Sequence, residues 1–115
     1  MFQLADENEI FEYPVTVRVP AGGGFSNEQT FTAKFRLVPA SELKAMQSGS
    51  DVEFFKRVLA GWDGIQNAAG KPLSFNATNL ERLADIGYFA VAVGQAYSSF
   101  AMGLPAKNSA PPRGP

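Results

Sequence analysis

The chain lacks two residue types that supply much of the reactive chemistry of proteins: it contains no cysteine and no histidine. Without histidine the usual general base near neutral pH is missing, and a Ser-His-Asp triad is excluded. Without either residue the common zinc and iron sites are excluded, and no disulfide framework can form. The sequence therefore predicts a protein that is not an enzyme and that uses neither a metal nor a cofactor.

Strong net charge is also lacking, because ten basic residues face eleven acidic ones and leave a net charge of −1. No overall field then favours nucleic acid or an anionic membrane as a partner. The N-terminal residues are acidic where an export signal would be basic and then apolar, so we expect a cytoplasmic protein. Partners must be sought in shape and apolar surface.

What the chain does have is enough apolar material for a core. Of its 115 residues, 45% are hydrophobic and ten are Phe. This length and composition predict a single domain over residues 1–104. Residues 105–115 contain four prolines and little to bury. They predict a disordered C-terminal tail.

Two segments alternate between apolar and polar residues, as expected for half-buried strands. They are residues 13–19 and 29–38, joined by a glycine-rich connection that predicts a hairpin tip. The inward side chains are expected to be Val15, Val17, Val19, Phe31, Ala33, Phe35 and Leu37. The outward face carries Arg18, Lys34 and Arg36, which form a weak candidate site for an acidic partner; the alternative is an ordinary solvated face.

Helical patterns follow the hairpin. Residues 41–46 predict a short helix, and Ser50 with Glu53 has capping-box spacing for a second helix over residues 51–61. Residues 61–75 read as a compact bend, and Asn76 can cap a further helix that ends near residue 85. We therefore expect an α+β fold in which an N-terminal antiparallel β-hairpin packs on three to four α-helices.

Residues 86–104 contain no charged side chain, which raises three alternatives: a membrane span, a core helix or a surface that binds a partner. Glycine, serine and glutamine leave too little strongly apolar surface for a lone span. On a helix, one stripe of large groups is expected to fill the core, with small residues beside it, Gly94 among them, that allow a neighbouring element to approach closely. That stripe is Ile86, Phe89, Val93, Tyr97, Phe100 and Leu104.

The opposite side of this helix is polar but uncharged, and it is unusually apolar for a surface that meets only water. We expect it to contact a partner or a second copy of the chain; the alternative is that another element of the same chain covers it. The candidate partner-binding residues are Tyr88, Val91, Gln95 and Met102, with Ser98 and Ser99 between them.

The segment over residues 58–80 resembles the tail assembly chaperones of long-tailed bacteriophages. The resemblance lies in Gly61-Trp62-Asp63-Gly64-Ile65, a turn containing Gly70, Pro72-Leu73-Ser74-Phe75 and Asn79-Leu80. With the preceding strands and the compact length, it covers about residues 10 to 104. The turn at residues 67–70 is less acidic than is usual in that family.

The resemblance implies a non-enzymatic protein made in the cytoplasm of the infected bacterial host, from a phage or a prophage, and not expected in the mature virion. Such a protein binds and solubilises the tape measure protein during tail morphogenesis. The tail tube protein and other copies of the chain are further partners to consider. Two alternatives stay open: a small structural virion protein involved in tail completion or associated with the tube, and a host-directed protein-binding module.

Overall fold

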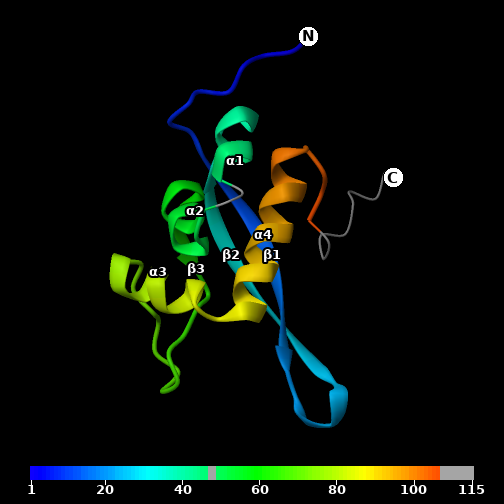
Figure 1. Cartoon of the computed structure of the whole chain (residues 1–115), viewed down its shortest axis with the longest axis vertical. Helices are drawn as coiled ribbons and strands as arrows, with labels where there is room; N and C mark the ends of the chain where they lie inside the picture. The colour runs from blue at the N-terminus through cyan, green and yellow to red at the C-terminus, as the bar shows by residue number, and fades with distance from the viewer. Residues whose placement is uncertain (47–48, 107–115) are drawn as a thin grey trace, which may run out of the picture.

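A computed structural model describes residues 1–46 and 49–106, and within these ranges the fold is α+β (Figure 1). Three strands form one antiparallel sheet in the order β1-β2-β3. Of the four α-helices, two lie between β2 and β3 in the sequence and two follow β3. In chain order the elements are β1 (Ile10–Pro20), a 3₁₀ turn (Gly22–Gly24), β2 (Ser26–Arg36), α1 (Ala40–Met46), α2 (Asp51–Val58), β3 (Leu59–Asp63), α3 (Ala77–Ala84) and α4 (Gly87–Ala101).

The predicted hairpin is confirmed, and it is longer than the alternating pattern alone indicated. β1 and β2 pair without interruption from Ile10 opposite Arg36 to Pro20 opposite Ser26. Alternate residues fill the core, since Val15, Ala33 and Phe35 are fully buried. The polar residues between them point away from the helices, which produces the period of two seen in the sequence.

Leu37 was expected to point inward with the other strand residues, and this prediction is wrong. β2 ends at Arg36, and Leu37 is exposed while Val38 is buried in its place. The backbone N–H of Val38 donates to the hydroxyl of Tyr97, at 2.9 Å, which turns the chain before Pro39 can continue the strand. Because the alternation of β2 stops at Arg36, the next side chain to enter the core is that of Val38 rather than that of Leu37.

The helix predicted for residues 51–61 begins as expected but ends early. The Ser50 hydroxyl caps it by accepting a hydrogen bond from the backbone N–H of Glu53, at 3.2 Å. The helix stops at Val58, and the next five residues form β3 along the free edge of β2. Gly61 and Trp62 therefore lie in a strand, where Trp62 pairs with Ala33, and the expectation of a helix or bend at these positions is wrong.

The compact bend exists further along, over residues 65–73. Gln66 forms a bridge with Pro72, and the backbone N–H of Leu73 donates to the carbonyl of Ile65, at 2.8 Å. The indole nitrogen of Trp62 donates to the carbonyl of Leu73, also at 2.8 Å. This hydrogen bond ties the miniature hairpin to β3. Trp62 therefore has a structural role: it is buried, and it connects β3 to the bend.

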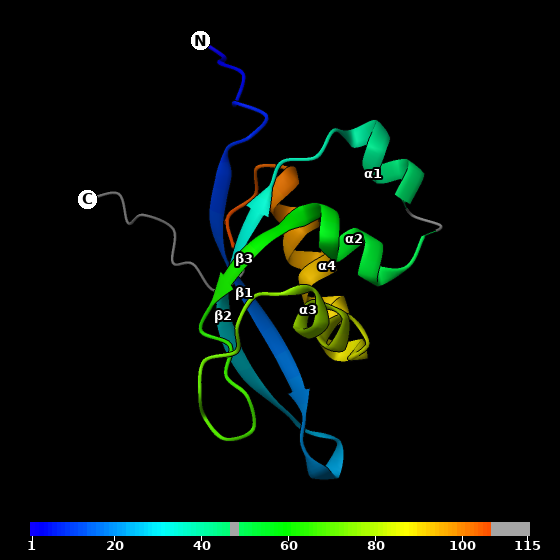
Figure 2. The same ribbon diagram turned by 90° about the vertical axis from the view of Figure 1, so that its left-hand side faces the viewer.

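The two last helices complete one side of the molecule. Asn76 caps α3 through its side-chain oxygen, which accepts from the backbone N–H of Asn79 at 2.8 Å. All four helices lie on the same side of the sheet, so the molecule has a sheet layer and a helical layer with the core between them (Figure 2). α4 packs mainly along β1. It also reaches β2, where Phe31 stacks on Phe89 of α4 with ring centroids 5.3 Å apart.

The core stripe of α4 is confirmed in its centre and altered at its end. Phe89, Val93 and Tyr97 are buried, and Ile86 and Phe100 pack against the core as half-buried residues. Leu104 was expected in this stripe, but the helix ends at Ala101 and the Leu104 side chain is exposed. Its carbonyl instead accepts a hydrogen bond from the Tyr13 hydroxyl, at 3.0 Å.

The chain after α4 returns to the sheet for a short distance. Ala106 lies in the hydrophobic core, although it falls within the tail that the sequence predicts from residue 105. The rest of that predicted tail, residues 107–115, lies outside the described residues.

Candidate protein-binding surface

The outer side of α4 forms an exposed surface without charged residues of its own. Its residues follow each other at spacings of three and four, which brings them onto one side of a helix. Val91 is 59% exposed and Met102 is 68% exposed, and Tyr88 is also exposed. Gln95 and Ser98 are exposed between them. We call these five residues, Tyr88, Val91, Gln95, Ser98 and Met102, the α4 stripe.

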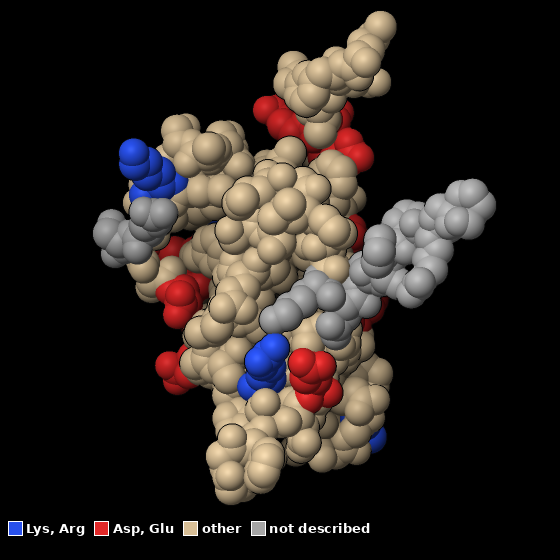
Figure 3. Space-filling view, turned by 90° about the vertical axis from the view of Figure 1, so that its right-hand side faces the viewer, with Lys and Arg blue, Asp and Glu red and all other residues tan. Residues whose placement is uncertain are grey.

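The absence of charge around the α4 stripe follows from the sequence. No charged residue occurs between Asp85 and Lys107, so no ionic side chain can emerge from the helix itself. The space-filling view shows a broad area without acidic or basic groups, with one basic and one acidic group side by side below it and further charged groups at its margins (Figure 3). Such a surface can bind a partner without first displacing tightly bound water from charged groups.

A groove separates α4 from the edge strand β1. One part of it, about 430 Å³ in volume, is lined on the α4 side by Gly87, Tyr88, Val91, Ala92 and Gln95, and on the sheet side by Thr16, Arg18 and Glu28. A second part shares Thr16, Ala92 and Gln95 and continues past Tyr13 and Ser99 with a volume of about 340 Å³. Burial raises the pKa of the Tyr13 hydroxyl, and a hydrogen bond with Ser99 lowers it by a smaller amount. The groove thus runs along α4 beside residues of the α4 stripe.

The backbone of β1 itself is poorly suited to adding another strand. The backbone N–H of Ala21 donates to the carbonyl of Phe25, at 2.9 Å, so these two residues form a hydrogen-bonded pair. The register of β1 and β2 is regular, and in an antiparallel ladder hydrogen-bonded pairs alternate with pairs that are not hydrogen-bonded. This alternation turns the backbone of Pro14 toward the open edge, where proline has no N–H to donate. A partner at this groove therefore contacts side chains more readily than it extends the sheet.

A second groove lies on the other side of α4, toward α1 and α2. Leu43 and Met46 from α1 and Phe54 from α2 face Gly94 and Met102 of α4 across a volume of about 430 Å³. Sequence reasoning missed these three residues from α1 and α2, because nothing local in the sequence brings them to α4. Gly94 was expected to allow a neighbouring element to approach closely, and this is wrong: no heavy atom lies within 4 Å of the position its Cβ would occupy.

Methionine suits the second groove because its unbranched, polarisable side chain adapts to irregular partners. Met46 and Met102 lie on opposite walls, and Leu43 supplies a branched apolar group beside them. An amphipathic helix that lays its apolar side into a groove is one common mode of protein recognition. The α4 stripe with its two flanking grooves therefore has the properties of a surface that binds helical or extended apolar segments.

The basic residues of the hairpin all engage acceptors of their own chain. Arg18 forms an ion pair with Glu28 at 3.8 Å, and Lys34 forms one with Asp63 at 3.4 Å. The guanidinium of Arg36 donates to the carbonyl of Leu59 at 2.7 Å. Each of these cations therefore has an acceptor on a neighbouring strand. The charges of Arg18 and Lys34 are paired with carboxylates, and Arg36 is hydrogen-bonded to a backbone carbonyl.

The acidic residues likewise serve local pairs. Glu81 on α3 forms an ion pair with Lys56 on α2, at 3.4 Å. Glu42 on α1 accepts two hydrogen bonds from the guanidinium of Arg57, one of them at 3.1 Å. This interaction lowers the pKa of Glu42 and raises that of Arg57. Within residues 1–46 and 49–106 no group of three or more acidic side chains is arranged to hold a metal ion.

No helix of the described part of the chain is long and apolar enough to span a membrane. Comparisons of the chain with protein-family models, curated proteins and solved structures find no match. Inferences about function therefore depend on the residues themselves and on the surface that they form.

Proposed function

We propose that the protein is a non-enzymatic tail assembly chaperone of a long-tailed bacteriophage or prophage, which binds the tape measure protein and keeps it soluble during tail assembly. The α4 stripe is the observation that carries the proposal. It exposes Val91 and Met102 on a helix without charged residues, flanked by two grooves. Charge enters the grooves only at their other walls, from Arg18 and Glu28 in one and from Asp51 in the other. The sequence motif at Trp62 and residues 72–75 supplies the resemblance to the chaperone family.

The chemistry of the client fits this surface. A tape measure protein is a long, helix-rich chain that aggregates when its apolar side chains are left uncovered. Its chaperone needs adaptable apolar contacts along a helix rather than a deep polar pocket. Leu43, Met46 and Met102 supply such contacts in the groove between α1 and α4.

Modest affinity for each contact is sufficient. A long client offers many similar helical segments, and many copies of this small protein can bind along it. Repeated contacts on one chain raise the overall avidity without any single strong interface. In this proposal the protein acts in the host cytoplasm and leaves before the tail is complete.

Co-expression with a tape measure protein of a long-tailed bacteriophage tests the proposal. The Val91→Lys/Met102→Lys double variant places two charges on the α4 stripe at exposed positions, so the fold is expected to stay intact. The soluble fraction of the client should fall to the level seen without the chaperone. A matched control, Gln3→Lys/Ala69→Lys, adds the same charge at exposed positions outside the stripe and should keep the client soluble.

Two results would contradict the proposal. The first is a client that is equally soluble with the wild type, with the double variant and with no chaperone at all. The second is the presence of the protein in purified virions at the stoichiometry of a tail component, measured by mass spectrometry. That second result would support a small structural virion protein instead.

A host-directed module that uses the basic hairpin residues is the weaker alternative. Arg18, Lys34 and Arg36 already contact Glu28, Asp63 and the Leu59 carbonyl. An acidic partner would have to displace these acceptors for little net gain, because exposed ion pairs contribute little energy.

A further inference from the structure

The β-hairpin projects beyond the helices that cover its base (Figure 1). On the side of the hairpin that faces the core, the side chains become more exposed toward the tip: Val15 and Val17 are buried, Val19 is half-buried, and Phe25 is 77% exposed. Ala21 and Phe25 are extended residues bonded to each other, so the alternation places Phe25 on the same side as Val17 and Val19. The apolar side of the hairpin therefore continues past the core and ends in an aromatic ring.

The glycines of the tip give this ring its position. Gly23 and Gly24 adopt φ values of 75° and 83°, which favour glycine over other residues. A Cβ at Gly23 would lie 3.4 Å from the ring of Phe25, so the ring rests against the glycine backbone of the turn. The tip thus presents a large, exposed apolar ring packed against the glycine backbone of the turn.

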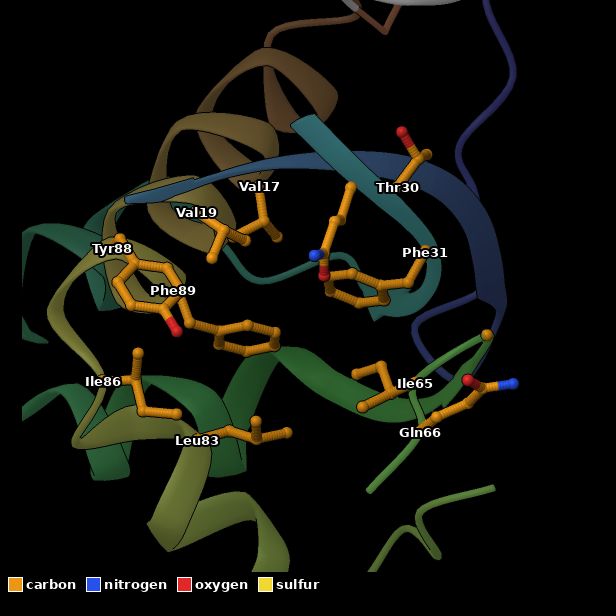
Figure 4. A pocket seen from close by; sticks show the side chains of 12 residues that line it. Val17, Val19, Thr30, Phe31, Ile65, Gln66, Leu83, Ile86, Tyr88 and Phe89 are labelled. Atoms are coloured by element: carbon orange, nitrogen blue, oxygen red, sulfur yellow. The ribbon is translucent and has the colours of Figure 1, made fainter. Parts of the chain in front are cut away.

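An apolar pocket lies at the base of the same hairpin, between it and the junction of α3 and α4 (Figure 4). Val17, Val19 and Phe31 form one wall, and Leu83, Ile86 and Phe89 form the other. Ile65 closes one side, and the uncharged polar residues Gln29, Thr30, Gln66 and Tyr88 complete the lining, so no lining side chain is charged. The pocket is suited to an apolar side chain.

The size of the pocket matches an aromatic ring. Its volume is about 220 Å³. An apolar cavity of about 150 Å³ is large enough to bind benzene. A phenylalanine side chain therefore fits with room for its Cβ. Phe25 does not fill the pocket of its own chain, because its ring is 77% exposed.

We propose that two copies of the chain form a two-fold dimer in which Phe25 of each copy enters the apolar pocket of the other. The ring and the pocket lie on the same side of one hairpin, so a single two-fold rotation makes both contacts at once. Each copy thereby covers the overhanging hairpin of its partner, and a hairpin without such cover is only marginally stable. The dimer does not depend on the proposed function: of the α4 stripe only Tyr88 lines the pocket, whereas Val91, Gln95 and Met102 lie outside it.

Analytical ultracentrifugation over a wide concentration range tests the proposal. Phe25→Ala should raise the dimer dissociation constant by about tenfold or more, because aromatic residues at the centre of an interface carry much of the binding energy. Phe2→Ala is the matched control: it removes the same ring from another exposed position and should leave the dissociation constant unchanged. A wild type that remains monomeric at every concentration would overturn the proposal.

A second variant changes the pocket rather than the hairpin tip. Ile86→Asp places a charge in the pocket wall, at the residue that precedes α4 and caps it without a side-chain hydrogen bond. Aspartate is favoured at such a position, which protects the fold. Alone, this variant should be as monomeric as Phe25→Ala.

Mixing the two variants gives the decisive measurement. The Ile86→Asp chain still has its Phe25 ring, and the Phe25→Ala chain still has its pocket, so a mixed dimer retains one of the two contacts. Mixed dimers should therefore form where neither variant dimerises alone. Failure to detect them, or normal dimerisation of either variant, would show that the hairpin tip does not occupy the pocket of a second copy.

Discussion

The Tyr97 hydroxyl accepts a hydrogen bond from the backbone N–H of Val38, at 2.9 Å, and so fixes the point where the sheet ends and the helical layer begins. The same hydroxyl donates to the carbonyl of Arg36, at 2.7 Å. Both partners of the hydroxyl, the Val38 N–H and the Arg36 carbonyl, lie where the chain leaves β2. α4 is thereby attached to the sheet by polar bonds as well as by packing.

Removing this hydroxyl should destabilise the protein. Tyr97→Phe keeps the ring, which packs edge-on against Phe35, but it leaves the buried N–H of Val38 without its partner. The cost of such a buried unsatisfied group is about 1–3 kcal/mol. Urea unfolding should show this loss. Tyr88→Phe, at an exposed position on the same helix, should change the free energy of unfolding by less than the error of the experiment, and an equal loss in both variants would contradict the interpretation.

Stability should fall at alkaline pH because of buried tyrosine. Burial raises the pKa of Tyr97, and the hydrogen bond from the Val38 backbone lowers it by a smaller amount. The unfolded chain then releases the tyrosine proton at a lower pH than the folded chain does. The contribution of Tyr97 is complete below the ordinary tyrosine pKa, about 10, and is lost as the pH rises through its raised folded value.

Unfolding free energies measured across the alkaline range check this prediction. Tyr97→Phe should flatten the decline, although it lowers stability at neutral pH. Tyr13, whose pKa burial also raises, contributes in the same direction, so a Tyr13→Phe/Tyr97→Phe variant should be flatter still. An alkaline decline that is identical in all three proteins would refute the assignment.

Acid should weaken the link between α1 and α2. The hydrogen bonds from Arg57 hold the pKa of Glu42 below its ordinary value. The stability that this carboxylate contributes is therefore present above its unfolded pKa and is lost as the pH falls through the lowered folded pKa. Glu42→Gln should remove that part of the acid dependence, while Glu7→Gln in the exposed N-terminal segment should retain it. Chemical denaturation at a series of acid pH values distinguishes the two.

Much of the fold was accessible from local sequence patterns. The alternation in residues 13–19 identified the buried side of β1, and Ser50 and Asn76 marked the starts of α2 and α3 through hydrogen bonds that the structure contains. These features depend on a residue and its near neighbours. They can therefore be recognised without knowledge of the tertiary structure.

The errors arose where a distant element decided the outcome. The helical pattern of α2 continues through Leu59 and Trp62, but the open edge of β2 draws this segment into a third strand, with Leu59 opposite Phe35. The register of β2 with β3 shifts between Lys34 and Phe35, and no local sequence pattern predicts this shift. Tertiary pairing here outweighs helix propensity.

The candidate surfaces show the same division. The α4 stripe was visible because a helix without charge is unusual in a chain of this composition. Its groove with Leu43, Met46 and Phe54 required the tertiary structure, since these residues come from two other helices. Phe25 lay in a connection that was interpreted only as a glycine-rich tip. Its significance depends on a pocket formed in part by distant segments, such as that around Phe89, which is 64 residues away in the sequence.

Gly94 offers a test that separates stability from binding. It lies in the interior of α4, its φ is not positive, and open space surrounds the position of a Cβ. Gly94→Ala should therefore raise the free energy of unfolding by about 0.5–1 kcal/mol, the usual cost of glycine within a helix. Gly103→Ala makes the same chemical change just after the helix, where φ is 74°, and should lower stability instead.

Gly94→Leu extends the test to the groove between α1 and α4. Leucine is also a good helix former, so the variant should fold at least as well as the wild type. Its side chain would project into the space that Leu43, Met46 and Met102 border. If the protein is the proposed chaperone and a tape measure protein binds in this groove, the soluble fraction of that client should fall although the Gly94→Leu variant itself is no less stable. A stable Gly94→Leu protein that solubilises the client as well as the wild type would show that this groove is not part of the binding surface.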